Sequence, residues 1–248
     1  MVGRGRIMSS AVGKLVSAKY LFAPKIASLT VMGIEERFPV RRVLCVGKNY
    51  ADHVAEMGGD AKKDPPLFFS KPADAIVDCH VTKSVKYPPH SSRINWEAEL
   101  VVAIGKAGTK IAHADAFSHI FGFAVGVDIT ARDLQETAKK LGRPWDMAKG
   151  FDESGPVGAI IPSPGGGWYS DDTLLQLTVN GEVKQSSQLK NMIWSVSDVI
   201  CELSSQIKLE EGDVIFTGTP SGVGEMKIGD EFSATCGDLP SCEFTLVK

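Results

Sequence analysis

The sequence lacks any long apolar run. None of its segments approaches the ~18–20 consecutive apolar residues that a membrane-spanning helix needs. It also lacks an excess of positive charge, because 27 Lys and Arg stand against 30 Asp and Glu, for a net charge of −3. Proteins that bind nucleic acid or membrane surfaces favour clustered Lys and Arg. The composition therefore predicts neither nucleic acid nor a membrane as a partner.

The sequence also lacks the paired cysteines of disulfide frameworks and zinc sites. Its five cysteines are odd in number and form no CxxC pair, which is typical of free thiols in a reducing compartment such as the cytoplasm. Residues 1–34 hold basic residues and serines but no acid. That composition fits a mitochondrial transit peptide or a disordered tail. Since residues 19–32 look strand-like, only residues 1–15 could be a targeting segment, which leaves mitochondrial as the alternative location.

Short strands dominate the rest of the chain. Residues 42–46 and 213–217 are apolar runs, and Asn180-Gly181 between two alternating segments is a strong hairpin signal. Helical patterns cover residues 130–141 and 197–207, with a shorter helix expected at 50–57. Many strands without βαβ alternation predict a β-rich α+β fold. We divide the chain into an N-terminal extension with lead-in strands (1–38) and a catalytic domain (39–248).

The most informative segment is residues 96–105, which we predict to be one strand. Its first face is wholly apolar, whereas Glu97 and Glu99 share the other face and point the same way. Two buried carboxylates repel each other, so either one is protonated or a cation lies between them. The alternative is an edge strand with two solvated glutamates.

A third carboxylate, Asp128, ends the apolar strand predicted at 121–127. A charge at the end of a buried strand needs a partner or a metal, although Asp128 could instead cap the following helix. Three carboxylates without a histidine or cysteine companion describe an oxygen site for Mg²⁺, Mn²⁺ or Ca²⁺ rather than for zinc.

Six motifs occur in an order that resembles the fumarylacetoacetate hydrolase superfamily, and within it the acylpyruvase and fumarylpyruvate hydrolase group. They are residues 45–53 (CVGKNYADH), 68–72 (FFSKP), 97–100 (EAEL), 126–135 (GVDITARDLQ), 149–152 (KGFD) and 217–224 (TGTPSGVG). The resemblance covers roughly residues 40–248. It implies a mixed sheet rolled into a distorted barrel, a homodimer, and Mg²⁺ or Mn²⁺ held by Glu97, Glu99 and Asp128. Trp96 stands where some relatives have histidine.

The resemblance makes His53 and Glu56 a catalytic dyad on a mobile lid helix. Their i, i+3 spacing puts them on one helix face, where a carboxylate would orient the imidazole as a general base. The alternative is a surface helix with two solvated side chains. We further expect residues 50–66 to close over a bound ligand.

The remaining site residues are also assigned by resemblance. Lys149 would stabilise enolate charge near the metal, and Lys71 would be a substrate-site residue that faces the dyad. Arg132 and Gln135, again i, i+3, would form a polar wall in which Arg132 suits a carboxylate, unless it pairs with Glu136. Gly218 and Thr219 would bring backbone and a hydroxyl to the substrate, unless they form an ordinary turn.

The implied reaction is the hydrolysis of a small acylpyruvate to pyruvate and a carboxylic acid, with the metal as Lewis acid. Two rivals stay open. Oxaloacetate decarboxylation or oxo-acid tautomerisation could use the same site, and a non-catalytic domain could hold a structural Ca²⁺.

Overall fold

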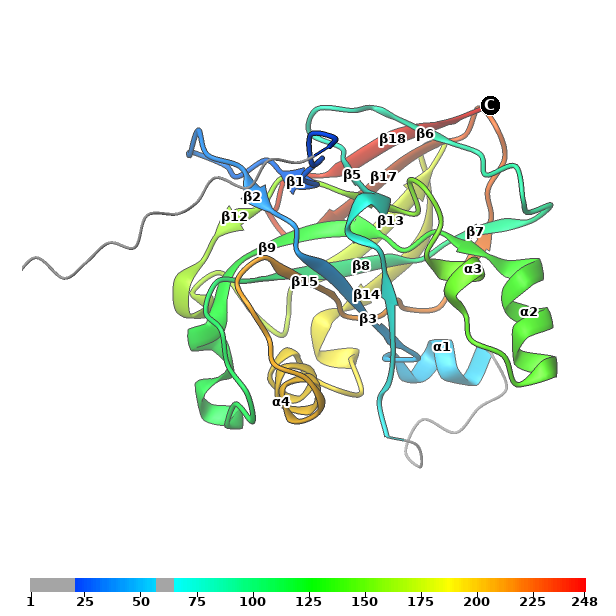
Figure 1. The fold of residues 1–248 in the computed structure, drawn as a ribbon. Helices are drawn as coiled ribbons and strands as arrows, with labels where there is room; N and C mark the ends of the chain where they lie inside the picture. The colour runs from blue at the N-terminus through cyan, green and yellow to red at the C-terminus, as the bar shows by residue number, and fades with distance from the viewer. Residues whose placement is uncertain (1–20, 57–64) are drawn as a thin grey trace, which may run out of the picture.

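The computed structural model describes residues 21–56 and 65–248, and the strands among them form four β-sheets. The largest sheet is mixed and eight-stranded, and it curls across the middle of the molecule (Figure 1). Its strands in spatial order are β4 (Leu67–Lys71), β3 (Arg42–Gly47), β15 (Asp213–Phe216), β8 (Ala98–Ile104), β9 (Ile120–Val127), β11 (Gly155–Val157) and β5 (Ile76–Asp78), with β12 (Ile161–Pro162) paired to β9.

The other sheets cover and extend this one. The five-stranded sheet has the order β14 (Glu182–Gln188), β13 (Leu174–Val179), β17 (Glu231–Cys236), β18 (Cys242–Val247) and β6 (Ser84–Lys86). The small sheets are β10 (Thr130–Ala131), β7 (Ile94–Trp96) and β16 (Gly224–Glu225), and β1 (Ser28–Leu29) with β2 (Phe38–Pro39). This is the β-rich α+β architecture that the sequence predicts.

Few helices accompany the sheets. They are α1 (Ala51–Glu56), α2 (Arg132–Leu141), α3 (Asp146–Lys149) and α4 (Val196–Gln206), with short 3₁₀ turns at Ala73–Ala75, His113–His119, Pro164–Gly166 and Leu189–Asn191. Figure 1 shows α1, α2 and α3 together at one end of the large sheet, and α4 apart from them. Within residues 21–56 and 65–248, none of the helices has the length and apolar character to span a bilayer.

Several local expectations are confirmed. Asn180 and Gly181 have φ of 52° and 80° and join β13 to β14, as an Asn-Gly hairpin turn requires. The helix α4 begins with a capping box, in which Ser195 and Asp198 bond each other's backbone N–H. It buries Val199, Ile200 and Leu203 on one face.

The central strand β8 is buried along its whole length, because both faces of the sheet are covered. Leu100, Val102 and Ile104 enter the larger core cluster between the two big sheets. Val101 and Ala103, on the opposite face, enter a second cluster with β1, β2 and β3. The alternation predicted from the sequence is therefore real, and the face that carries the glutamates is buried as well.

Two element boundaries differ from the prediction. The strand expected at 96–105 is two strands, because the chain passes at Glu97 from the small sheet of β7 to the large sheet of β8. The helix expected from Thr130 begins at Arg132, since Thr130 and Ala131 pair with Asn95 and Ile94 as β10.

Candidate metal centre

Three carboxylates meet where β8 and β9 run side by side. Glu97 lies just before β8, Glu99 is its second residue, and Asp128 follows the last residue of β9. The register sets Ala98 opposite Val127, and Asp128 N–H donates to the Glu97 carbonyl at 2.7 Å. All three side chains are buried, and one oxygen from each lies within 4.8 Å of the others. Because both glutamates are buried, the alternative of a solvated edge strand is wrong. Asp128 does not cap the following helix either, because the residue before α2 is Ala131.

Two cations hold Glu97 in place. Lys149 Nζ donates to Glu97 Oε2 and to Asp128 Oδ2, at 2.7 Å each. Arg132 Nη2 donates to Glu97 Oε1 at 2.6 Å, and its Nη1 donates to Gln135 Oε1 at 2.6 Å. Arg132 and Gln135 thus form the predicted polar wall, while Glu136 pairs with Arg93 instead.

These charges move the pKa values of the two glutamates apart. Burial alone would raise the pKa of Glu97, but Lys149 and Arg132 outweigh it and lower that pKa to about 2. The pKa of Glu99 is raised well above its usual value by burial and then by Asp128. Burial likewise opposes the charged form of Lys149, but Asp128 and Glu97 raise its pKa.

Lys71 lies behind Asp128 rather than facing the dyad. Its side chain is wholly buried, and Nζ lies 2.8 Å from Asp128 Oδ1. It also donates to the carbonyls of Ile129 and Lys149, and it is absent from the pocket lining. The expectation that Lys71 faces His53 is therefore wrong, and so is the alternative of a solvated surface lysine.

The donor set fits a hard divalent cation. Asp128 Oδ1 has no hydrogen-bond partner among the described residues, since Lys71 stands at ion-pair distance but outside hydrogen-bond geometry. A buried carboxylate oxygen without such a partner, in a group of three carboxylates, suits Mg²⁺ or Mn²⁺, which prefer oxygen ligands. Glu97, Glu99 and Asp128 could hold that ion.

A loop after β15 supports Glu99. Gly218 N–H donates to Glu99 Oε2 at 2.6 Å. Gly218 has φ of 98°, and a Cβ there would lie 2.5 Å from Asn49 Cβ, so only glycine fits. Asn49 is fully buried and holds the loop by donating to the carbonyls of Thr217 and Trp194.

Thr219, next in this loop, lines the pocket. Its hydroxyl accepts a hydrogen bond from Gln185 Nε2 at 2.8 Å, and Gln185 Oε1 accepts from Ala98 N–H. Asn49 and Gln185 are supporting residues that were not predicted from the sequence. Asn49 lies inside a quoted motif, whereas a lone Gln185 on a strand carries no signal.

His53 and Glu56 form a side-chain pair on α1. His53 is buried and lines the pocket, and its Nδ1 is 3.3 Å from Glu56 Oε2. The predicted pairing is present on α1, so the alternative of two separately solvated side chains is wrong. The expected closure of residues 50–66 falls largely on residues 57–64, which lie outside the described residues.

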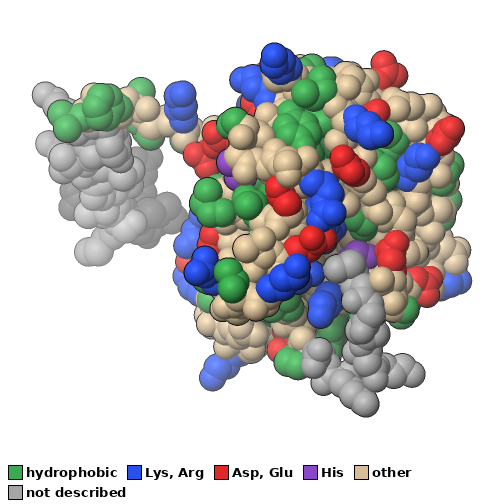
Figure 2. All heavy atoms as spheres, turned by 90° about the vertical axis from the view of Figure 1, so that its right-hand side faces the viewer, with side chains coloured by type: hydrophobic (Ala, Val, Ile, Leu, Met, Phe, Trp, Pro, Cys, Tyr) green, Lys and Arg blue, Asp and Glu red, His purple; other side chains and the backbone are tan. Residues whose placement is uncertain are grey.

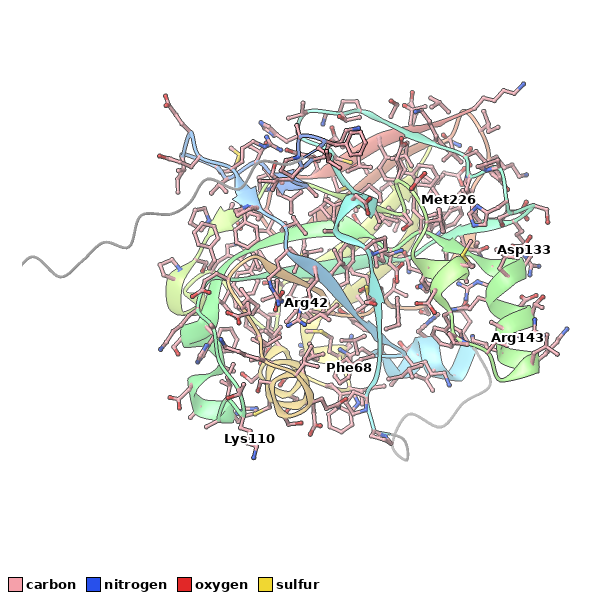
Figure 3. All side chains as sticks on the ribbon, viewed as in Figure 1. Arg42, Phe68, Lys110, Asp133, Arg143 and Met226 are labelled. Carbon is pink, nitrogen blue, oxygen red and sulfur yellow. The ribbon has the colours of Figure 1, made fainter. Side chains whose placement is uncertain are left out.

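A loop pins the first turn of α2 close to Glu97. Asp133 accepts hydrogen bonds from the Ser91 hydroxyl and from the Ser92 hydroxyl and N–H. Burial would raise the pKa of Asp133, but these hydrogen bonds outweigh it and lower that pKa to about 2. Figure 3 labels Asp133 near the start of α2 and Arg143 beyond its end. Ser91 and Ser92 lie just before β7, which ends one residue before Glu97. Their contact with Asp133 therefore fixes the start of α2, and with it Arg132, relative to Glu97.

The family model for fumarylacetoacetate (FAA) hydrolase, C-terminal, matches residues 42–247. The chain belongs to the fumarylacetoacetate hydrolase family. This is a family of enzymes, which argues against the alternative of a non-catalytic Ca²⁺ domain.

Similar proteins include oxaloacetate tautomerases and a fumarylpyruvate hydrolase. The mouse oxaloacetate tautomerase FAHD1, mitochondrial, is 41% identical over 84% of this chain and 92% of its own. The Escherichia coli oxaloacetate tautomerase YcgM is 38% identical over 80% of this chain and 89% of its own. The crystal structure of Pseudomonas aeruginosa fumarylpyruvate hydrolase with Mn²⁺ and pyruvate is 42% identical, covers 92% of this chain and 99% of its own, and has a TM-score of 0.89.

These comparisons confirm the predicted superfamily and its fold, with a mixed sheet curled toward a barrel. They also support the expected cofactor, because a structural relative of the same fold was crystallised with Mn²⁺ and this chain has a buried acidic triad.

Proposed function

We propose that this family member hydrolyses the carbon–carbon bond of a small acylpyruvate, such as a fumarylpyruvate-like 2,4-dioxo acid, to pyruvate and a carboxylic acid. The observation that carries the proposal is the buried cluster of Glu97, Glu99 and Asp128 with Lys149 between two of its carboxylates. The structural similarity to a fumarylpyruvate hydrolase holding Mn²⁺ and pyruvate supports it.

In this proposal Glu97, Glu99 and Asp128 are the metal ligands. A divalent ion held there would supply Lewis-acid stabilisation of negative charge on oxygen and would orient the 2-oxo acid end. Arg132 and Lys149 fix Glu97, and Lys71 fixes Asp128 from behind. Gly218 orients Glu99 through its N–H, and Gln135 and Thr219 complete the substrate wall.

His53 is the proposed general base, with Glu56 orienting its imidazole. His53 takes a proton from water, and the hydroxide adds to the acyl carbonyl carbon. The bond between that carbon and the methylene carbon then breaks, and its electron pair leaves with the pyruvate fragment as an enolate. Lys149 places its ammonium beside this negative charge, and a proton delivered to the methylene carbon completes pyruvate. The acyl carbon keeps the hydroxyl and leaves as the carboxylic acid.

The second candidate function is keto–enol tautomerisation of oxaloacetate, which the names of the mouse and Escherichia coli relatives favour. Decarboxylation of oxaloacetate would use the same enolate stabilisation. Neither reaction needs an activated water, so the two differ from hydrolysis in their demand on His53.

A substrate panel separates these candidates. The purified chain with Mg²⁺ should release pyruvate from fumarylpyruvate or acetylpyruvate, measured by a coupled lactate dehydrogenase assay, and EDTA should stop it. Glu99→Gln should lose Mg²⁺ binding and turnover while it stays folded, because Gln keeps an acceptor for Gly218 N–H. Glu231→Gln, an exposed control on β17, should behave as wild type. If neither acylpyruvate releases pyruvate while oxaloacetate is tautomerised, the second candidate replaces the first.

Two broader expectations stay proposals. The homodimer comes from the resemblance alone. For the compartment, the mitochondrial name of the mouse relative supports the mitochondrial alternative over the cytoplasmic one, and residues 1–15 lie outside the described residues.

A further inference from the structure

Four cationic side chains line the pocket beside the carboxylate cluster, and they fall into two pairs. Arg132 and Lys149 form the inner pair, and both are bonded to Glu97. Lys48 and Lys139 also line the pocket but are exposed, and they form the outer pair. Among residues 21–56 and 65–248, no acidic side chain forms an ion pair with Lys48 or Lys139. The outer pair therefore offers positive charge that the described protein does not neutralise.

We propose that Lys48 and Lys139 form an anion site at the pocket mouth that recognises a second carboxylate at the far end of the substrate. The inference rests on the proposed function and narrows its substrate class to dioxo acids with a carboxylate at both ends. A monocarboxylic acylpyruvate would leave this pair without a partner.

The backbone at Lys48 is held in an uncommon conformation. Its φ is 63°, a left-handed value that a long side chain rarely adopts and that functional sites often retain. The next residue, Asn49, fixes the turn, since Trp194 N–H donates to Asn49 Oδ1 at 2.7 Å and Ile193 N–H to its carbonyl at 2.7 Å. The turn thus presents the Lys48 side chain to the pocket.

Lys139 reaches the mouth from α2. It is one turn beyond Gln135 and two turns beyond Arg132, so the three side chains share one helix face. Its Nζ lies 5.2 Å from the ring centroid of Trp145. Partial burial, and then Arg132, lower the pKa of Lys139, and Lys48 acts in the same direction. Positive charges therefore lie close together at the mouth, and a carboxylate there would relieve their repulsion.

An aromatic wall joins the inner pair to the outer pair. Lys149 Nζ lies 4.8 Å from the ring centroid of Phe69, and the Phe69 and Trp145 centroids are 5.8 Å apart. Lys149 and Lys139 therefore stand at the two ends of a continuous Phe69–Trp145 surface. A flat unsaturated chain with an anionic group at each end matches this order, because aromatic faces favour stacking with planar groups. The space-filling view from the α2 side shows Lys and Arg side chains interspersed with acidic ones across this face (Figure 2).

A binding experiment that needs no turnover tests the site. The Mg²⁺-loaded chain is titrated calorimetrically with 2-oxoheptanedioate and with 2-oxoheptanoate, which differ only in the distal carboxylate. Wild type should bind the diacid more tightly than the monoacid. Lys139→Gln and Lys48→Gln should each reduce this difference in affinity by about 5- to 20-fold, a loss between those expected for exposed and for buried charged contacts. Lys140→Gln, the exposed neighbour on α2, should keep it. The proposal is overturned if wild type shows no preference, or if Lys139→Gln weakens both acids equally, which would indicate general attraction of anions.

Turnover separates this inference from the proposed function. For Lys139→Gln, the ratio of kcat/KM for fumarylpyruvate to kcat/KM for acetylpyruvate should fall by about the factor lost in binding. If wild type hydrolyses neither acid yet its diacid preference depends on Lys139, the mouth site stands and the hydrolase proposal fails. If both acids are hydrolysed and the ratio is unchanged in Lys139→Gln, the hydrolase proposal stands and the mouth site fails.

Discussion

At the scale of single residues, the charge on Lys149 keeps the carboxylate cluster together. Its ammonium is 2.7 Å from both Glu97 and Asp128, and all three side chains are almost fully buried. A buried charge is tolerated only when it is paired and hydrogen-bonded. The lysine that the proposal places beside the enolate therefore also has a structural task, so replacing it would not report on catalysis alone.

His53 offers a cleaner test of mechanism, because it lines the pocket and pairs with Glu56 rather than with the carboxylate cluster. General base catalysis commonly contributes a factor of roughly 10²–10⁴. We expect His53→Ala to lower acylpyruvate hydrolysis by about that factor, while oxaloacetate decarboxylation in the same preparation falls far less. Glu97→Gln should abolish both reactions, since both need the metal. His80→Ala, an exposed histidine, is the control. An equal loss in both reactions for His53→Ala would make His53 a substrate-positioning residue and would leave the base unidentified.

The sequence predicts the residues of this site better than it predicts their partners. The alternation around Glu97 and Glu99, and Asp128 at a strand end, are local patterns that survive in the structure. The contacts of Lys71 with Asp128 and of Arg132 with Glu97 join residues 57 and 35 positions apart. No local periodicity records such pairings, because they depend on how the sheets pack.

At the scale of elements, the same contrast appears in the strand at 96–105. Its apolar alternation correctly predicts extended chain, but periodicity cannot show which sheet each half joins. The chain changes sheets at Glu97, where β7 pairs with β10 and β16 while β8 pairs with β15 and β9. One step beyond the last β8–β9 pair, Ala98 and Val127, Asp128 N–H donates to the Glu97 carbonyl, and this contact brings two of the carboxylates together.

The loop after β15 allows a matched comparison of two glycines. Gly218 and Gly229 have φ of 98° and 96°, but an added Cβ would collide with Asn49 only at Gly218 and would meet nothing within 4 Å at Gly229. We expect both alanine variants to lose about 1–2 kcal/mol of stability from the backbone conformation. Only Gly218→Ala should also lose metal affinity, by about 10- to 100-fold, because its Cβ would displace the backbone N–H that orients Glu99. Calorimetric titration with Mn²⁺ measures this, and equal affinities in the two variants would contradict the supporting role of the loop.

At the scale of the whole molecule, the lead-in segment before residue 39 packs on the domain that carries the site. Leu29, Val31 and Phe38 are buried in the second core cluster, which also contains Val101 and Ala103 of β8. Thr30 and Arg37 bond to Asp78 at the end of β5. The sequence could not show this, because residues 28–38 have too little regular pattern to reveal a docking partner. The division of the chain at residues 38 and 39 stays a prediction about where the catalytic domain begins.

Two leucines of the lead-in segment differ sharply in burial. Leu29 is 0% exposed and Leu21 is 96% exposed. Leu29→Ala should lower the free energy of unfolding by about 2–5 kcal/mol, as in other cores, and Leu21→Ala should change it by less than about 0.5 kcal/mol. Urea denaturation followed by circular dichroism measures both. Mg²⁺ should recover part of the loss, because it binds to the folded state alone. A Leu29→Ala variant as stable as Leu21→Ala would show that residues 21–38 are an appendage, and that the domain with its metal site folds without them.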